Sequence, residues 1–112
     1  MDTHRDPRDL AVDLIPRSIC RIMVAAVIAD KWGIHSWGHN HVGFDGLGQH
    51  GEAEAIRRAN KSRLKGSTIY VAAIRQRNGK IVPAKPCPEC ARLISKWSLQ
   101  VCYRDRGGWH YE

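Results

Sequence analysis

Two short motifs, H-G-E at residues 50–52 and P-C-P-E-C at residues 86–90, constrain this chain most, because a hydrolytic zinc site needs both in one place. Imidazole nitrogen and thiolate sulfur are the usual zinc ligands in proteins. A structural zinc normally has four protein ligands, whereas three leave a position for a water that becomes hydroxide near neutral pH. We therefore expect His50, Cys87 and Cys90 to bind a metal. Glu52 is then free to move protons.

Both motifs fall where helices are expected to begin. A helical pattern starts near His50, and another runs from Cys87 to Lys96. Unpaired N–H groups and the positive dipole end of a helix start stabilise negative charge, so we expect a lowered thiol pKa there. The i, i+3 spacing places Cys87 and Cys90 at one helix edge. In the first turn of the other helix, His50 and Glu52 can straddle the helix start.

The rest of the chain predicts alternating helices and strands. Asp6 is a capping residue for a first helix that ends before Pro16. The expected strands are residues 22–29, 34–37, 67–74 and 99–103. The first two should form a hairpin, and residues 38–49 have loop composition. The turn at residues 105–108 is too short for a parallel crossover, so any following strand should run antiparallel to the fourth.

Composition bounds the class of protein. With 112 residues, 43% of them hydrophobic, we expect one domain spanning residues 1–112. The longest apolar run, residues 22–29, is far shorter than the roughly 20 residues of a membrane span. The polar segment 1–9 lacks the apolar centre of a secretory signal, which favours a cytoplasmic location where thiols stay reduced. Cys20 and Cys102 lie in apolar segments and are expected to be buried core residues.

The order of motifs between residues 22 and 103 is that of a known family. A hairpin, G-H-N, a loop, H-G-E-A-E-A-I, S-T-I-Y-V, P-C-P-E-C and a strand follow one another. H-x-E followed by P-C-x-x-C is the signature of zinc nucleobase deaminases. The chain thus resembles the cytidine deaminase-like superfamily. The resemblance implies a three-layer α/β/α fold with a mixed sheet of about five strands, both zinc-bearing helices on one face, and a C-terminal antiparallel hairpin.

The C-terminal hairpin indicates which branch of the superfamily the chain resembles. It is similar to the ending of the free-cytidine deaminases and bacterial deaminase toxins. Transfer-RNA adenosine deaminases and deoxycytidylate deaminases carry an extra helix instead. The resemblance therefore favours cytosine over adenine as the base, in a small single-domain enzyme of the bacterial or phage type.

The same resemblance assigns roles in the site. His50, Cys87 and Cys90 would bind Zn²⁺, and Glu52 would carry the proton from water to the leaving amine. Among the substrate contacts, Asn40 matches a sugar-contacting asparagine. The expected contacts to the base are the N–H of Gly51 and a carbonyl near Lys85 and Pro86. The family usually has alanine where this chain has Gly51.

Other residues have both a functional and a structural interpretation. Phe44 could stack on the base or anchor its loop to the core. The net charge of +7 predicts attraction to phosphate groups. A basic run could track a nucleic-acid backbone or form a solvated helix face; it consists of Arg57, Arg58, Lys61, Arg63 and Lys65. Exposed aromatic residues on a short chain suggest a homo-oligomer.

Three functions remain open. The first is zinc-dependent hydrolytic deamination of cytosine to uracil in a cytidine or deoxycytidine nucleoside or nucleotide. The second is the same reaction on cytosine within single- or double-stranded nucleic acid. The third is a catalytically idle scaffold, including a closed structural zinc site with His39 or His41 as its fourth ligand. The presence of Glu52 argues against the third.

Overall fold

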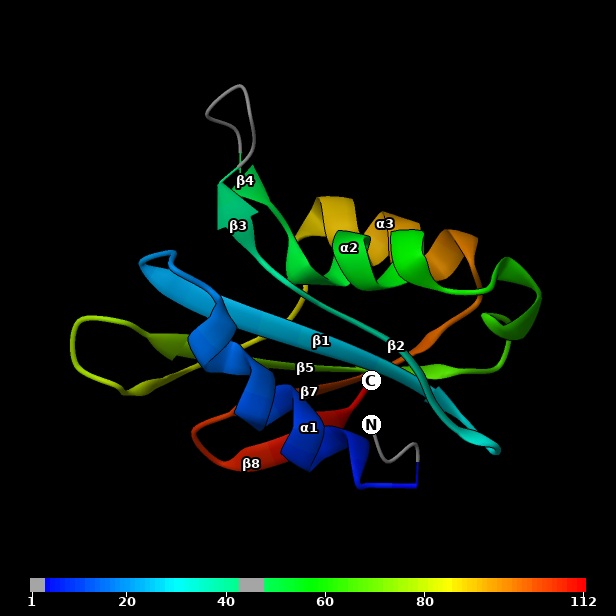
Figure 1. Cartoon of the computed structure of the whole chain (residues 1–112), viewed down its shortest axis with the longest axis horizontal. Helices are drawn as coiled ribbons and strands as arrows, with labels where there is room; N and C mark the ends of the chain where they lie inside the picture. The colour runs from blue at the N-terminus through cyan, green and yellow to red at the C-terminus, as the bar shows by residue number, and fades with distance from the viewer. Residues whose placement is uncertain (1–3, 43–47) are drawn as a thin grey trace.

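A mixed sheet forms the centre of the chain in the computed structural model, which describes residues 4–42 and 48–112 (Figure 1). Within these residues the strand order is β2-β1-β5-β7-β8, and β6 pairs with β5. The strands are β1 (Ile22–Asp30), β2 (Gly33–His39), β5 (Thr68–Arg75), β6 (Ile81–Val82), β7 (Gln100–Asp105) and β8 (Gly108–Tyr111). Only β5 and β7 pair in parallel; the other pairs in this sheet are antiparallel.

Helices cover both faces of the sheet. The helices α2 (Gly51–Arg58) and α3 (Pro88–Lys96) lie together on one face, and α1 (Pro7–Leu14) crosses the other (Figure 1). Because strand side chains alternate, Ala26 and Ile28 of β1 pack under α2 and α3, whereas its odd-numbered neighbours pack against α1. The result is the expected three-layer α/β/α arrangement. It also places the starts of both motif-bearing helices on the same side of the sheet.

The first helix follows its sequence signals. The Asp6 side chain accepts a hydrogen bond from the N–H of Arg8, and Pro7 occupies the first helical position. Leu10, Ala11 and Leu14 are buried against the sheet. The α-helix ends at Leu14, before Pro16 as predicted, and a 3₁₀ turn, η1 (Ile15–Arg17), continues the helical segment through Pro16. A second 3₁₀ turn, η2 (Lys61–Arg63), follows α2.

Several details differ from the sequence predictions. The strand β2 extends two residues further than expected, and the predicted loop contains a two-stranded pair, β3 (His41–Val42) with β4 (Gly48–Gln49). The short strand β6 was not expected, because two residues carry too little pattern to detect. In the described residues, no helix is long and apolar enough to cross a membrane.

The two cysteines outside the motif have different environments. Cys102 is fully buried in β7, as predicted. The same prediction for Cys20 is wrong, because Cys20 lies in the connection between η1 and β1 and is only partly buried. It lines a pocket beside the zinc motifs instead of entering the core.

Candidate metal centre and substrate pocket

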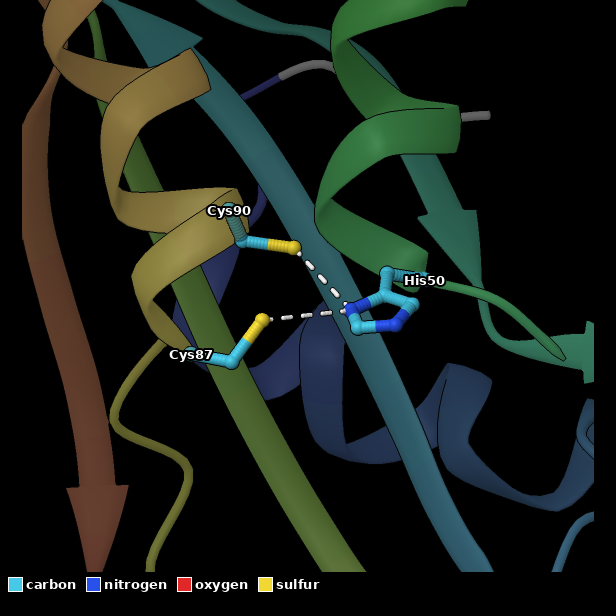
Figure 2. Close-up of side chains that lie close together, drawn as sticks. All are labelled: His50, Cys87 and Cys90. Carbon is cyan, nitrogen blue, oxygen red and sulfur yellow. Dashed lines mark hydrogen bonds between the residues drawn. The ribbon is translucent and has the colours of Figure 1, made fainter.

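The starts of α2 and α3 bring the three expected metal ligands together. His50 is the N-cap of α2, Cys87 is the N-cap of α3, and Cys90 lies one turn into α3. Figure 2 shows the His50 imidazole pointing toward both thiols. Its Nδ1 atom is 3.1 Å from the Cys90 sulfur and 3.5 Å from the Cys87 sulfur. All three ligand atoms lie within 4.8 Å of one another.

These separations fit zinc. Tetrahedral zinc with Zn–S near 2.3 Å and Zn–N near 2.0 Å holds a nitrogen and a sulfur ligand about 3.5 Å apart. The two observed separations are equal to this value or slightly shorter. The donor set of one imidazole and two thiols is also one that zinc favours. Zinc would therefore be held through Nδ1 of the histidine and the two sulfurs.

The described residues do not supply a fourth protein ligand. In this part of the chain, the cluster of metal-binding side chains contains His50, Cys87 and Cys90 alone. The Nε2 atom of His41 donates to Glu54 at 2.6 Å, and Nδ1 of His39 lies 3.2 Å from the carbonyl of Asn40. Both histidines weighed as a fourth ligand thus have partners elsewhere. The open, three-ligand arrangement is the one that catalytic zinc sites use.

Glu52 lies beside the metal ligands, and little of it is exposed to solvent. It lies in the first turn of α2, and its side chain is buried. Burial raises the pKa of this carboxyl, while its own backbone N–H, the charge of His50 and the Cys90 thiol oppose the rise. The carboxyl lines the same pocket as His50 and Cys87. Glu52 is therefore placed to exchange protons with a molecule in that pocket.

Without a bound metal, the pKa of the Cys90 thiol is raised above its usual value. Burial raises the pKa of this thiol, and the nearby charge of Glu52 raises it further. The charge of a bound zinc ion deprotonates a coordinating thiol outright, so the metal itself must supply the thiolate form.

A pocket of about 270 Å³ adjoins the metal ligands. Three of the expected substrate-contacting residues line it, namely Asn40, Gly51 and Lys85. Pro86 lies between two lining residues but is not one of them. Phe44 falls outside the described residues. The pocket therefore gathers most of the expected contacts on the zinc side of the sheet.

Asn40 is already tied into the protein. Its side-chain oxygen accepts hydrogen bonds from the N–H of Val24 at 2.8 Å and the hydroxyl of Ser18 at 2.6 Å. Its amide nitrogen donates to the carbonyl of Ile22 at 2.7 Å. These bonds use the oxygen fully and leave one N–H available. Asn40 therefore holds the pocket wall in place and can offer a substrate one donor only.

Sequence reasoning missed Glu54, which organises the same wall. This buried carboxylate accepts hydrogen bonds from the backbone N–H of His39 at 3.2 Å and from His41 at 2.6 Å. Burial alone would raise its pKa, but these bonds and the charge of Arg58 lower it below the usual value. Glu54 thus fastens the end of β2 to α2. The sequence signals it only as a second acid in the motif H-G-E-A-E.

Two glycines allow β2 to pass directly against α2. A Cβ added to Gly38 would lie 2.7 Å from the backbone nitrogen of Ala55 and 2.7 Å from the carbonyl oxygen of Gly51. A Cβ on Gly51 would lie 3.2 Å from the Cα atom of His39, at the end of β2. Glycine at position 51, where the family usually has alanine, therefore matches a close backbone contact in this chain.

The basic run does not reach the pocket. It begins near the end of α2, which carries it about 12 Å from the zinc end of the helix. The ammonium group of Lys61 donates to three carbonyls at the end of α2, at 2.7, 2.9 and 3.0 Å. Arg63 forms two bonds to Asp30, at 2.9 and 2.8 Å. The charged groups of Lys61 and Arg63 are therefore bonded within the protein, where they stabilise the fold.

Comparison with known proteins identifies the family. The sequence profile of the cytidine and deoxycytidylate deaminase zinc-binding region matches residues 1–103. The chain belongs to this family. Zinc is accordingly the metal of this deaminase-family protein, and His50, Cys87 and Cys90 are positioned to hold it. Among curated protein sequences, none matches the chain significantly.

Solved structures show the same fold. Cytidine deaminase from Burkholderia pseudomallei has a TM-score of 0.73, covering 99% of this chain and 92% of that one at 17% identity. Cytidine deaminase from Mycobacterium leprae has a TM-score of 0.60, covering 93% and 88% at 19% identity. Acinetobacter baumannii RibD has a TM-score of 0.58 at 21% identity, and the match covers 87% of this chain but 27% of RibD. The predicted fold class is confirmed.

Proposed function

We propose that residues 1–112 form one zinc-dependent deaminase domain that converts cytosine to uracil in a cytidine or deoxycytidine nucleoside or nucleotide. The observation that carries this proposal is the convergence of His50, Cys87 and Cys90 at one wall of a pocket that also contains the buried Glu52. Family membership supports the reaction type. The C-terminal hairpin of β7 and β8 supports cytosine as the base, because it resembles the ending of cytidine deaminases.

Different residues of the pocket have different roles in the proposed hydrolysis. Zinc, when bound, lowers the pKa of a coordinated water toward neutrality and so supplies the nucleophile. Glu52 takes one proton from the attacking water and passes it to the ring nitrogen, then takes the second proton from the hydroxyl group now on the carbon and gives it to the amine, which leaves as ammonia while the carbonyl forms. The net reaction consumes one water and releases ammonia. The N–H of Gly51 and a carbonyl near Lys85 hold the base so that its amine-bearing carbon faces the nucleophile.

Cytosine within a polynucleotide is the alternative substrate. The net charge of +7 favours a phosphate-bearing partner. The basic run from Arg57 to Lys65 gives this alternative little support, because it lies at the far end of α2.

Exposed apolar side chains support assembly of several copies. The largest of these exposed side chains are Ile19, Trp32 and Tyr111.

The test is a substrate panel. Purified protein with measured zinc content is incubated with cytidine, deoxycytidine, their 5′-monophosphates and a cytosine-containing oligonucleotide, and ammonia and uracil products are quantified. The matched control is Glu52→Gln, which keeps the shape of the side chain and removes its ability to carry a proton. We expect turnover by the original protein only. Stoichiometric zinc without a uracil product from any of these substrates would refute the proposed function.

A further inference from the structure

A second hollow opens beside the substrate pocket. It has a volume of about 440 Å³ and is lined by Arg21, Ile22, Arg75, Gln76 and Arg77. The side chain of Ile22 lines both this hollow and the substrate pocket. The two spaces are therefore neighbours on either side of Ile22.

The pairing of β1 with β5 places lining residues of the hollow on the zinc side of the sheet. Ile22 of β1 pairs directly with Arg75 of β5, and directly opposed residues of an antiparallel pair project from the same face. Ala73, two residues before Arg75, lines the substrate pocket. Side chains two residues apart on a strand share a face at a spacing of roughly 7 Å. Arg75 thus lies on the same face of the sheet as the substrate pocket. The distance from Ala73 in the pocket to Arg75 is shorter than one nucleotide.

The positive charge of the hollow is not neutralised by the protein. Among the described residues, no carboxylate lies within ion-pair distance of Arg21, Arg75 or Arg77. The groove between α2 and α3 differs, because two glutamates line it together with its basic residues. Three arginine residues line this space with no acidic residue among them, and their positive charge attracts an anion.

We propose that this hollow binds a phosphate ester on the sugar of the cytosine nucleoside, so that the protein prefers phosphorylated substrates to free nucleosides. Guanidinium groups bind phosphate through two parallel hydrogen bonds, which suits a site with several arginines. The phosphate can be the 5′-phosphate of a mononucleotide or a backbone phosphate of a polynucleotide. This inference rests on the proposed deaminase function and names its substrate class.

The test compares substrates in a double variant, Arg75→Ala with Arg77→Ala. We expect the ratio of kcat/KM for cytidine 5′-monophosphate to that for cytidine to fall about tenfold or more, because each lost charge-assisted bond weakens binding by roughly that factor. A fall for both the mononucleotide and an oligonucleotide assigns the hollow to the 5′-phosphate. A fall for the oligonucleotide alone, with a shallower salt dependence, assigns it to a backbone phosphate.

Two controls separate charge from folding. The variant Lys31→Ala with Lys65→Ala removes the same amount of charge from exposed positions away from the hollow, and we expect its substrate ratio to stay at the original value. The variant Arg75→Lys with Arg77→Lys keeps the charge and should recover part of the preference. Zinc content and melting temperature are measured for every variant. A double alanine variant with unchanged kcat/KM for both cytidine 5′-monophosphate and the oligonucleotide, each relative to cytidine, would overturn the phosphate site.

A binding measurement makes the inference independent of turnover. The Glu52→Gln protein is titrated with cytidine and with cytidine 5′-monophosphate by calorimetry, and the phosphate should tighten binding about tenfold. Adding the two alanine substitutions should abolish that gain. Equal affinities for the two ligands, together with oligonucleotide turnover that the two alanine substitutions leave unchanged, would refute the phosphate site and leave cytidine deamination standing. Tighter binding of the phosphate, in combination with no turnover of any panel substrate by the original protein, would support the site and refute the proposed function.

Discussion

Replacing Gly38 by alanine should disturb both stability and the zinc site. The added Cβ would lie 2.7 Å from the nitrogen of Ala55 and from the carbonyl oxygen of Gly51, and both are backbone atoms of α2. Ordinary van der Waals contact begins near 3.4 Å. The strand and the helix must therefore separate by about 0.7 Å, because backbone atoms cannot rotate away as side chains can. The start of α2 carries His50 and Glu52, so this displacement reaches the active site.

Two effects of opposite sign determine how much Gly38→Ala changes the free energy of unfolding. Alanine in place of glycine reduces the entropy of the unfolded chain, which stabilises by about 0.4–1 kcal/mol. Overpacking of a close contact destabilises by about 1–3 kcal/mol. We expect a net loss of about 1–2 kcal/mol, or a melting temperature roughly 5–10 °C lower for a domain of this size. A displacement approaching 1 Å at a catalytic group can also reduce activity about a hundredfold.

The assays are thermal unfolding followed by circular dichroism, and kcat/KM for the best substrate of the panel. The control is Gly107→Ala, whose Cβ would meet the Asp105 side chain at 3.3 Å, a contact that a flexible carboxylate can relieve. We expect that control to unfold within about 2 °C of the original protein. A Gly38→Ala protein with unchanged melting temperature and activity would show that β2 and α2 are not in tight contact.

Three further predictions concern metal, proton transfer and pH. The Cys87→Ser, Cys90→Ser double variant should lose zinc by elemental analysis, and near-stoichiometric zinc in it would contradict the ligand assignment. Glu52→Gln should keep zinc and fold while turnover falls at least a hundredfold, and retention of a tenth of the rate would exclude Glu52 as the proton carrier. Burial and the charge of Arg63 lower the pKa of His35 below 6.5, although Asp30 opposes this. The folded state favours neutral His35, so stability should fall as pH drops below 6.5. We expect His35→Gln to flatten that part of the melting profile, and an unchanged profile would contradict the assignment.

The sequence predicts the zinc ligands because their chemistry is local. A histidine before one helix and two cysteines at i, i+3 at the start of another need only a fold that brings the helix starts together. The helices and long strands also carry clear periodicity, so the three-layer fold could be expected. The strand β6, with two residues, carries no such signal.

Long-range partners are what the sequence does not reveal. Arg63 belongs to a basic run in the sequence, yet its charge is met by Asp30, which lies 33 residues earlier. Asn40 matches a substrate contact, but its side-chain oxygen is occupied by Ser18 and Val24. Counting charges and motifs treats each side chain as free. Tertiary contacts decide which of them face a ligand.

The connection from the end of β5 to the start of α3 brings parts of the pocket, the hollow and the metal centre into one stretch of chain. Residues 75–87 carry two arginines of the basic hollow, then a wall of the substrate pocket at Pro83, Ala84 and Lys85, and then a metal ligand, Cys87. The strands and helices on either side contribute the scaffold. Evolution or protein engineering could therefore exchange the turn of this segment for another and alter substrate preference, while the sheet, the metal centre and the proton carrier remain as they are.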